Sequence, residues 1–116
     1  MPNTIIFTKE APAPIGPYSQ AVLAGNTLYV SGQIALDAET GELINENITE
    51  AVLRAAKFSF SDVVKCTIFI QNMDQFGVIN EAYGQYFKNN PPARETVEVS
   101  RLPKHVNVEI SCVAVK

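Results

Sequence analysis

The sequence has 116 residues, a formal net charge of −3, 47% hydrophobic residues and 18% charged residues. This length fits a single domain over residues 1–116, and the scattered lysines and arginines form no basic stripe that would bind nucleic acid. No apolar run is long enough to span a bilayer and the N-terminus lacks a secretion signal, so we expect a cytoplasmic protein without membrane contact. Because charged residues are few, we also expect another copy of the chain to cover part of the surface.

Alternating or β-branched side chains mark six candidate strands. They lie at residues 4–7, 19–23, 27–31, 61–71, 91–100 and 106–115. Gly25 and Asn26 join the second and third as a hairpin tip, and prolines within residues 11–17 exclude a helix before Tyr18. Gly32 follows the third strand, where it either lets a ligand approach the backbone or forms a turn or bulge.

Two amphipathic helices are expected between these strands. After a loop over residues 34–43, the first helix is predicted over residues 47–57, with Asn47 as its cap and Glu50 reaching back to that cap. The second is predicted over residues 74–88, with Asp74 as its cap and an apolar stripe facing inward. The fold class is therefore α+β, with a mixed sheet of about six strands and two helices on one face.

The fourth strand, residues 61–71, is nearly continuously apolar, which predicts a central strand buried on both faces. Cys66 lies in this strand and Cys112 in the last one, and their wide spacing fits neither a metal site nor a redox motif. We expect two reduced, buried thiols. His105 stands alone in a loop, where a solvated residue is expected more often than a catalyst.

The last two strands carry the candidate catalytic residues. Their link, residues 101–105, is short and contains a proline, which predicts an antiparallel hairpin with Thr96 opposite Glu109. On this interpretation Val97, Val99, Val108 and Ile110 share one face. The polar residues of the opposite face would be Arg94, Thr96, Glu98, Asn107, Glu109 and Ser111.

Placed on one face, Arg94 and Glu109 could form a site. A guanidinium grips a carboxylate in two places, and a neighbouring glutamate can move protons. The alternative is a weak cross-strand ion pair on an exposed sheet surface, and spacing alone leaves both possibilities open.

Four sets of segments, in the same order along nearly the whole chain, carry a specific likeness. They are residues 13–21; residues 29–34; residues 62–67 with 80–83; and residues 92–99 with 102–104 and 108–110. Together these segments resemble the RidA (YjgF) family of enamine/imine deaminases. The resemblance implies a chorismate-mutase-like α+β fold, a homotrimer with three ligand clefts between subunits, and neither cofactor nor metal.

The same resemblance implies hydrolysis of reactive 2-imino acids, which arise when pyridoxal-phosphate enzymes dehydrate threonine or serine, to 2-oxo acids and ammonia. One alternative is a non-catalytic trimer that binds small carboxylates or regulates another protein. A second alternative is an RNA-acting, endoribonuclease-like protein, which the acidic charge balance disfavours.

By resemblance, Arg94 matches the family arginine that binds the substrate carboxylate, and Glu109 matches the glutamate that positions or activates water. Tyr18 matches a tyrosine that lines the cleft, and Ser31 and Gly32 match a segment that orients the ligand.

Two further positions complete the expected site. Phe87, or a neighbouring aromatic residue, would supply an apolar wall. Thr96 stands where many relatives carry cysteine, so a thiol has no role at this position, although imine hydrolysis needs none.

The first helix departs from the family pattern, because about three turns between its start and its end are missing. A break in the chain next to Glu50 and Ala51 would indicate residues absent from the sequence. A real deletion is instead expected to bare apolar sheet surface and to put the stability of the fold in doubt.

Overall fold

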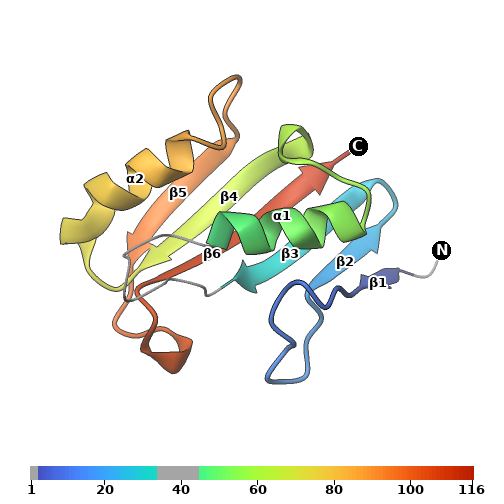
Figure 1. Ribbon diagram of the computed structural model, residues 1–116, viewed down its shortest axis with the longest axis horizontal. Coiled ribbons are helices and arrows are strands. Elements are labelled where there is room, and N and C mark those ends of the chain that lie inside the picture. Colours follow the sequence, from blue (N-terminus) through green and yellow to red (C-terminus); the bar gives the residue numbers. More distant parts are fainter. Residues whose placement is uncertain (1–2, 34–44) are drawn as a thin grey trace.

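The computed structural model describes residues 3–33 and 45–116, in which a six-stranded mixed sheet carries two α-helices on one face (Figure 1). The strands are β1 Thr4–Ile6, β2 Ala21–Ala24, β3 Thr27–Gln33, β4 Val63–Ile70, β5 Ala93–Glu98 and β6 Val108–Val115. The helices are α1 Asn45–Ala55 and α2 Phe76–Gly84. The predicted α+β class is confirmed, whereas the loop predicted over residues 34–43 lies outside the described residues.

The order of strands across the sheet is β1-β2-β3-β6-β4-β5. β4 and β5 are parallel and the other neighbouring pairs are antiparallel. Parallel neighbours need a crossover connection, and α2 supplies it between β4 and β5. The predicted hairpin of β5 with β6 is therefore wrong, because β4 lies between them.

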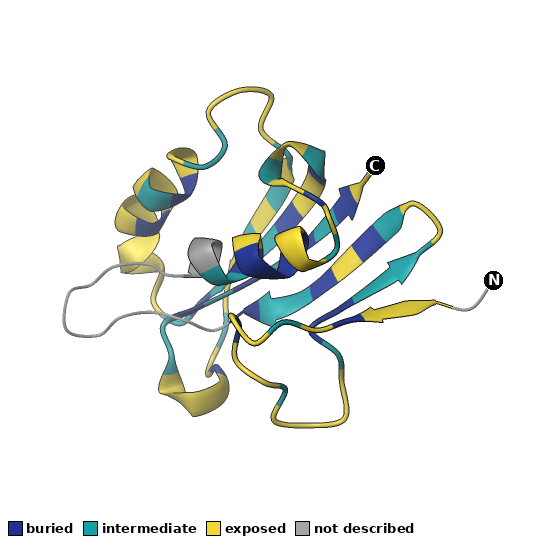
Figure 2. Cartoon of the chain, turned by 45° about the vertical axis from the view of Figure 1, so that its right-hand side comes forward, coloured by how far each residue is buried: buried dark blue, intermediate teal, exposed yellow. Residues whose placement is uncertain are grey.

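The core lies between the sheet and the helices, and buried residues alternate with more exposed ones along β3, β4 and β6 (Figure 2). Its largest fully buried side chains are Leu28, Leu53, Ile68, Ile70, Val52 and Val108. Each such side chain stabilises the fold by roughly 1.5–3 kcal/mol. Only the helix-facing residues of β4 are buried, so the prediction that this strand is buried on both faces is wrong for the single chain.

Cys66 and Cys112 face each other directly across β4 and β6, and both are buried and form no disulfide, as predicted. Burial raises the pKa of the Cys112 thiol to about 12, with a smaller contribution from the neighbouring Cys66. The reactive thiolate of Cys112 is therefore scarce at neutral pH, which fits a packing role.

Both helices begin and end differently from the prediction. α1 starts at Asn45, so Asn47 lies inside it and is not the cap, and the helix runs unbroken through Glu50 and Ala51. A 3₁₀ turn, Met73–Gln75, precedes α2, and the Asn72 side chain caps it by accepting a hydrogen bond from the backbone N–H of Asp74 at 2.9 Å. The predicted Asp74 cap is wrong. Neither described helix is both long and apolar enough to cross a membrane.

The short α1 does not bare the sheet beneath it. The helix-facing side chains of β4 and β6 stay buried, with Ile70 and Val108 fully inaccessible and Ile110 at 4% exposure. The expectation that a shortened helix would expose apolar sheet surface is therefore wrong for the described residues.

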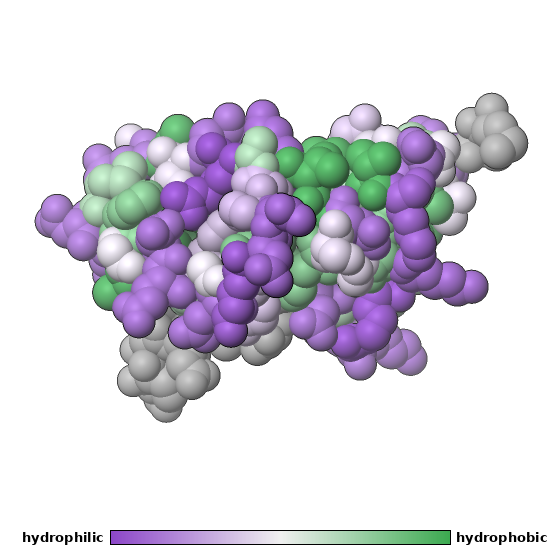
Figure 3. Space-filling model, turned by 90° about the horizontal axis from the view of Figure 1, so that it is seen from above, coloured by the Kyte–Doolittle hydropathy of each residue, from purple (hydrophilic) through white to green (hydrophobic). Residues whose placement is uncertain are grey.

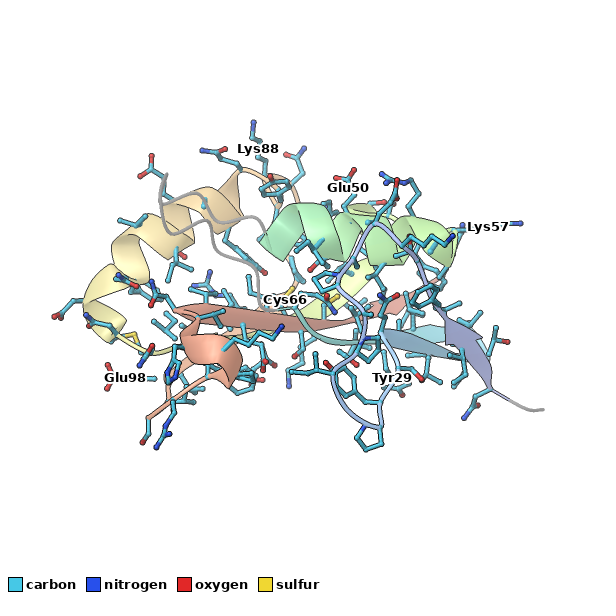
Figure 4. All side chains as sticks on the ribbon, turned by 60° about the horizontal axis from the view of Figure 1, so that its bottom comes forward. Tyr29, Glu50, Lys57, Cys66, Lys88 and Glu98 are labelled. Atoms are coloured by element: carbon cyan, nitrogen blue, oxygen red, sulfur yellow. The ribbon has the colours of Figure 1, made fainter. Side chains whose placement is uncertain are left out.

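The opposite face of the sheet is uncovered by helix and carries apolar side chains. One row across it joins Ile5, Val22, Tyr29 and Val113, each paired with the next across neighbouring strands. Ile5 is 62% exposed and Tyr29 is 54% exposed. In Figure 4 the labelled Tyr29 lies on the side of the sheet away from α1 and α2. In Figure 3 this side of the sheet points upward, and hydrophobic atoms gather at part of the upper margin of the molecule.

Candidate active site

Glu109 lies on the uncovered face of the sheet, in β6 beside an irregularity in β3. Val30 pairs with Cys112 and Gln33 with Ile110, so two residues of β3, Ser31 and Gly32, oppose the single residue between those partners. This arrangement is a β-bulge, a feature that re-aims side chains next to functional sites. Of the two roles that the sequence left open for Gly32, the bulge is confirmed.

The absence of a side chain at Gly32 makes room for Glu109. A Cβ atom built on Gly32 would lie 2.5 Å from Cδ of Glu109 and 2.7 Å from both Cγ and Oε2. Real Cβ atoms do not approach other atoms so closely, so the Glu109 side chain occupies this space because residue 32 is glycine.

Burial raises the pKa of the Glu109 carboxyl above its ordinary value. Among the described residues, no cation forms a salt bridge with this carboxylate, and none donates a hydrogen bond to it. Desolvation without a compensating positive charge favours the protonated form and moves titration toward neutral pH. A carboxyl group in this setting can exchange a proton with a bound molecule.

A pocket lies next to Gly32. Its lining includes Tyr18, Gln33 and Lys104, together with part of the proline-rich segment before Tyr18. Ser31 belongs to the segment that, by resemblance, is expected to orient the ligand, and its hydroxyl donates a hydrogen bond to the backbone carbonyl of Ser19. The structure thus brings Tyr18, Ser31, Gly32 and Glu109 to one end of β3; we call these four residues the Glu109 group.

Gln20 holds the proline-rich segment in place. Its side-chain amide is 2% exposed and donates to the carbonyls of Thr8, Ala11 and Pro12 at 3.1, 3.3 and 3.0 Å, while its Oε1 accepts from the Thr8 N–H at 2.7 Å. One buried amide thus satisfies three backbone carbonyls and one backbone N–H of this segment. The sequence did not identify Gln20 as a residue of the site, although an amide side chain three residues after Pro17 was the available signal.

Arg94 lies on the helix side of the sheet, in β5 next to Cys66 of β4. Its Nη1 donates to Oδ1 of Asn80 on α2 at 2.8 Å. Its guanidinium carbon lies 4.8 Å from the ring centroid of Tyr83 and 5.6 Å from that of Phe76, both also on α2. None of these three partners was predicted as a site residue, and the signal lay in their i, i+4 and i+7 spacing on one helix face.

Thr96 and Phe87 are also on the helix side. Thr96 pairs with the buried Ile68 of β4, and its hydroxyl oxygen is buried without a hydrogen-bond partner among the described residues. The Phe87 ring packs against Tyr83 with the ring centroids 4.7 Å apart and against Phe60 edge to face with the centroids 5.3 Å apart. The aromatic rings that contact Arg94 are those of Phe76 and Tyr83, and not that of Phe87. We call the following four residues the Arg94 group: Arg94, Asn80, Phe76 and Tyr83.

Arg94 and Glu109 point to opposite faces of the sheet. Arg94 pairs with Cys66, which belongs to the helix-facing row, whereas Glu109 pairs with Phe69, which belongs to the uncovered row with Val97. The prediction that Arg94, Thr96 and Glu109 share one face is wrong. Within one chain, the side chains of Arg94 and Glu109 therefore cannot enter the same cavity. Within the described residues there is also no cluster of three or more His, Cys, Asp or Glu side chains that could hold a metal ion.

Comparison with known proteins connects this fold to one family. The family model Endoribonuclease L-PSP matches residues 8–116. A RutC family protein of Pyrococcus horikoshii is 47% identical over 122 aligned positions, which cover 97% of each chain. The 2-iminobutanoate/2-iminopropanoate deaminase of Homo sapiens is 42% identical over 122 positions, which cover 97% of this chain and 89% of the human protein. The two alignments span 122 positions, more than the 116 residues of this chain, so these relatives contain residues that this chain lacks.

Solved structures agree with the sequence comparison. RidA from the Antarctic bacterium Psychrobacter superposes with a TM-score of 0.89 at 38% identity, covering 97% of this chain and 99% of that one. E. coli TdcF with bound serine superposes with a TM-score of 0.87 at 38% identity, covering 97% and 98%. The mixed sheet with two helices is therefore the architecture of these proteins.

Proposed function

Because the chain belongs to the RidA (YjgF) family, we propose that it hydrolyses reactive 2-imino acids to 2-oxo acids and ammonia. Relatives from human, mite and rat at 42–44% identity bear the name 2-iminobutanoate/2-iminopropanoate deaminase. The observation that carries the proposal is the Glu109 carboxyl, which rests on Gly32 with a raised pKa. A general base works best when its pKa lies near the operating pH.

The reaction needs orientation, one water molecule and proton transfer. The imine nitrogen carries a proton at the start. Glu109 takes a proton from water as the water oxygen bonds to the iminium carbon, and a neutral tetrahedral carbinolamine forms. Glu109 then returns this proton to the amine nitrogen, the carbon–nitrogen bond breaks as the carbonyl forms, and the hydroxyl proton leaves with the ammonia as ammonium. Arg94 holds the substrate carboxylate through two parallel hydrogen bonds, which fixes the imine carbon relative to the water.

The proposed cleft lies between two copies of the chain. Since Arg94 and Glu109 face opposite sides of one sheet, a substrate can meet both only if each comes from a different subunit. We place the Arg94 group of one subunit against the Glu109 group of its neighbour, three times in a homotrimer. The apolar row of Ile5, Val22, Tyr29 and Val113, in which Ile5 and Tyr29 are exposed, supports such an assembly, because contiguous apolar surface often marks a contact with another protein.

Turnover of 2-iminobutanoate, generated freshly from threonine by a dehydratase, tests the activity. The wild-type protein is expected to accelerate release of 2-oxobutanoate. Arg94→Ala should lose both carboxylate binding and turnover, whereas Glu109→Gln should keep binding and lose turnover by a factor of about 100 or more. Full turnover by Glu109→Gln would remove this residue from the mechanism.

Mixing the two inactive variants tests the position of the cleft. After co-refolding of Arg94→Ala with Glu109→Gln in equal amounts, each mixed trimer would have one cleft that combines an intact Arg94 with an intact Glu109, which is about a quarter of all clefts in the sample. Turnover should therefore reappear to that extent. If no activity returned although mixed trimers formed, the two residues would not meet across a subunit boundary.

A trimer that merely binds small carboxylates is the principal alternative. It would bind 2-oxobutanoate in an Arg94-dependent way while leaving 2-iminobutanoate to decay at its spontaneous rate. The same binding and turnover assays on the wild-type protein therefore separate a deaminase from a binding protein.

A further inference from the structure

The Arg94 guanidinium lies over two aromatic rings of α2. Its central carbon is 4.8 Å from the ring centroid of Tyr83 and 5.6 Å from that of Phe76. A guanidinium is planar and weakly hydrated, and it is attracted to the face of an aromatic ring. Two rings at these distances restrict the plane of the cation, which its own flexible stem cannot do.

Tyr83 is the better fixed of the two rings. Its side chain is buried at 5% exposure and packs against Phe87 at 4.7 Å, whereas Phe76 is 36% exposed. Tyr83 also belongs to the hydrophobic core that contains Ile68 and Ile110. The position of its ring is therefore set by the fold and is present before any ligand arrives.

Asn80 fixes the remaining freedom of the cation within its plane. It accepts a hydrogen bond from Nη1 of Arg94 at 2.8 Å, and no other hydrogen bond or ion pair joins this guanidinium to a described residue. A guanidinium carries five N–H donors, so an edge with two parallel donors is left for a carboxylate.

We propose that Tyr83 is a positioning residue for Arg94: its ring holds the guanidinium plane so that the free edge faces the substrate carboxylate. This inference rests on the proposed function, in which Arg94 anchors a 2-imino acid. Tyr83 does not contact the substrate in this scheme, and it acts through the orientation of the cation.

The ring and the hydroxyl of Tyr83 can be separated by substitution. The hydroxyl is buried without a well-formed hydrogen bond among the described residues, and it lies near the Cys66 thiol. Burial raises the pKa of this hydroxyl far above its ordinary value, so it stays neutral and adds no charge beside Arg94. Tyr83→Phe should therefore preserve the positioning role, and Tyr83→Met, which keeps most of the volume but lacks a ring, should abolish it.

The experiment measures the affinity of 2-oxobutanoate by calorimetry, together with kcat and KM for 2-iminobutanoate. Tyr83→Met should weaken binding of 2-oxobutanoate about threefold to thirtyfold and raise KM, as expected for the loss of one cation–π contact. Tyr83→Phe should keep the wild-type affinity for 2-oxobutanoate and the wild-type KM. Phe60→Met is the matched control, because Phe60 packs in the same aromatic cluster against Tyr86 and Phe87 without touching Arg94.

A second measurement needs no variant. In the wild-type protein, the Nε–Hε group of Arg94 should show a higher NMR order parameter than that of the exposed Arg101. Equal mobility of the two groups would overturn the inference, even if Tyr83→Met failed to fold.

The outcomes also distinguish this inference from the proposed function. If Arg94→Ala abolishes binding of 2-oxobutanoate while Tyr83→Met binds it normally, the anchor stands and the positioning role is wrong. If Arg94→Ala itself binds 2-oxobutanoate normally, Arg94 does not bind the substrate carboxylate and the proposed function is wrong on this point. Equal losses in Tyr83→Met and Phe60→Met would reduce Tyr83 to a packing residue and overturn the inference.

Discussion

The Glu109 carboxyl occupies the space that a side chain at residue 32 would fill. The bulge in β3 aims Gly32 at this carboxyl, and the pocket lined by Tyr18 begins beside it. The position of the Glu109 carboxyl therefore depends on the absence of a Cβ atom at residue 32. The sequence predicted that Gly32 matters, but it could not show that Glu109 is the group that approaches the backbone there.

Gly32→Ala should separate catalysis from stability. The new Cβ would overlap Cγ and Cδ of Glu109, and because a glutamate side chain is flexible, the carboxyl should move aside without unfolding the sheet. We expect turnover of 2-iminobutanoate to fall about tenfold to a hundredfold. The free energy of unfolding, measured in urea, should change by less than about 1 kcal/mol. Wild-type turnover in this variant would show that the position of Glu109 is not critical.

The raised pKa of Glu109 should appear in the pH dependence of stability. Below the unfolded-state pKa of about 4.3, both states bind the proton, and folding buries no charge at this position. As pH rises through the higher folded-state pKa, the folded protein must bury a charge and loses stability. Glu109→Gln should therefore match the wild-type Tm near pH 4 and exceed it by a few degrees near pH 7. A difference in Tm that did not vary with pH would contradict this account.

Among the elements, the strands and helices followed from side-chain periodicity, whereas the pairing of the last strands did not. Alternation in β5 looks the same whether its neighbour is parallel or antiparallel. The short link before β6 favoured an antiparallel hairpin of β5 with β6, whereas the order β4, α2, β5 along the chain indicated that β4 and β5 are parallel neighbours. A helix between two strands is the usual crossover of parallel neighbours, and this pairing places β4 between β5 and β6.

The pairing error also explains the wrong face for Arg94. Within each strand the alternation is correct, because Arg94 and Thr96 share a face and Glu109 and Ser111 share a face. The relation between the two strands depends on register, and a shift of one residue reverses every side chain. Sequence could therefore identify both charged residues but could not decide whether they lie on one side of the sheet.

The segment between β1 and β2 should depend on Gln20. Replacing its amide by leucine leaves the carbonyls of Thr8, Ala11 and Pro12 and the N–H of Thr8 without their buried partner. We expect Gln20→Leu to lower the free energy of unfolding by about 2 kcal/mol or more, and to expose the segment before Tyr18 to proteolysis. The exposed Gln85→Leu is the control and should change stability little. Equal effects of the two variants would mean that the amide does not hold the segment.

For the whole molecule, the important asymmetry lies between the two faces of the sheet. Helices α1 and α2 cover one face of the sheet (Figure 1). The other face carries apolar side chains from β1, β2, β3 and β6. Burial of such a face in a second copy would recover roughly 25 cal/mol for each Å² removed from water. The low content of charged residues, 18%, agrees with a surface that is partly covered by another copy.

Tyr29→Lys should therefore dissociate the assembly that we propose. Tyr29 is central in the exposed row, and a lysine there would have to bury an ammonium group against the apolar side chains of a second copy. We expect analytical ultracentrifugation to show a smaller species, and turnover of 2-iminobutanoate to fall with it, because Arg94 and Glu109 would no longer meet. Val78→Lys is the matched control, since Val78 is 69% exposed on α2, on the other side of the sheet. If Tyr29→Lys kept the wild-type mass and activity, the uncovered face would not be the contact between subunits. The proposed cleft between the Arg94 group of one subunit and the Glu109 group of its neighbour would then be wrong.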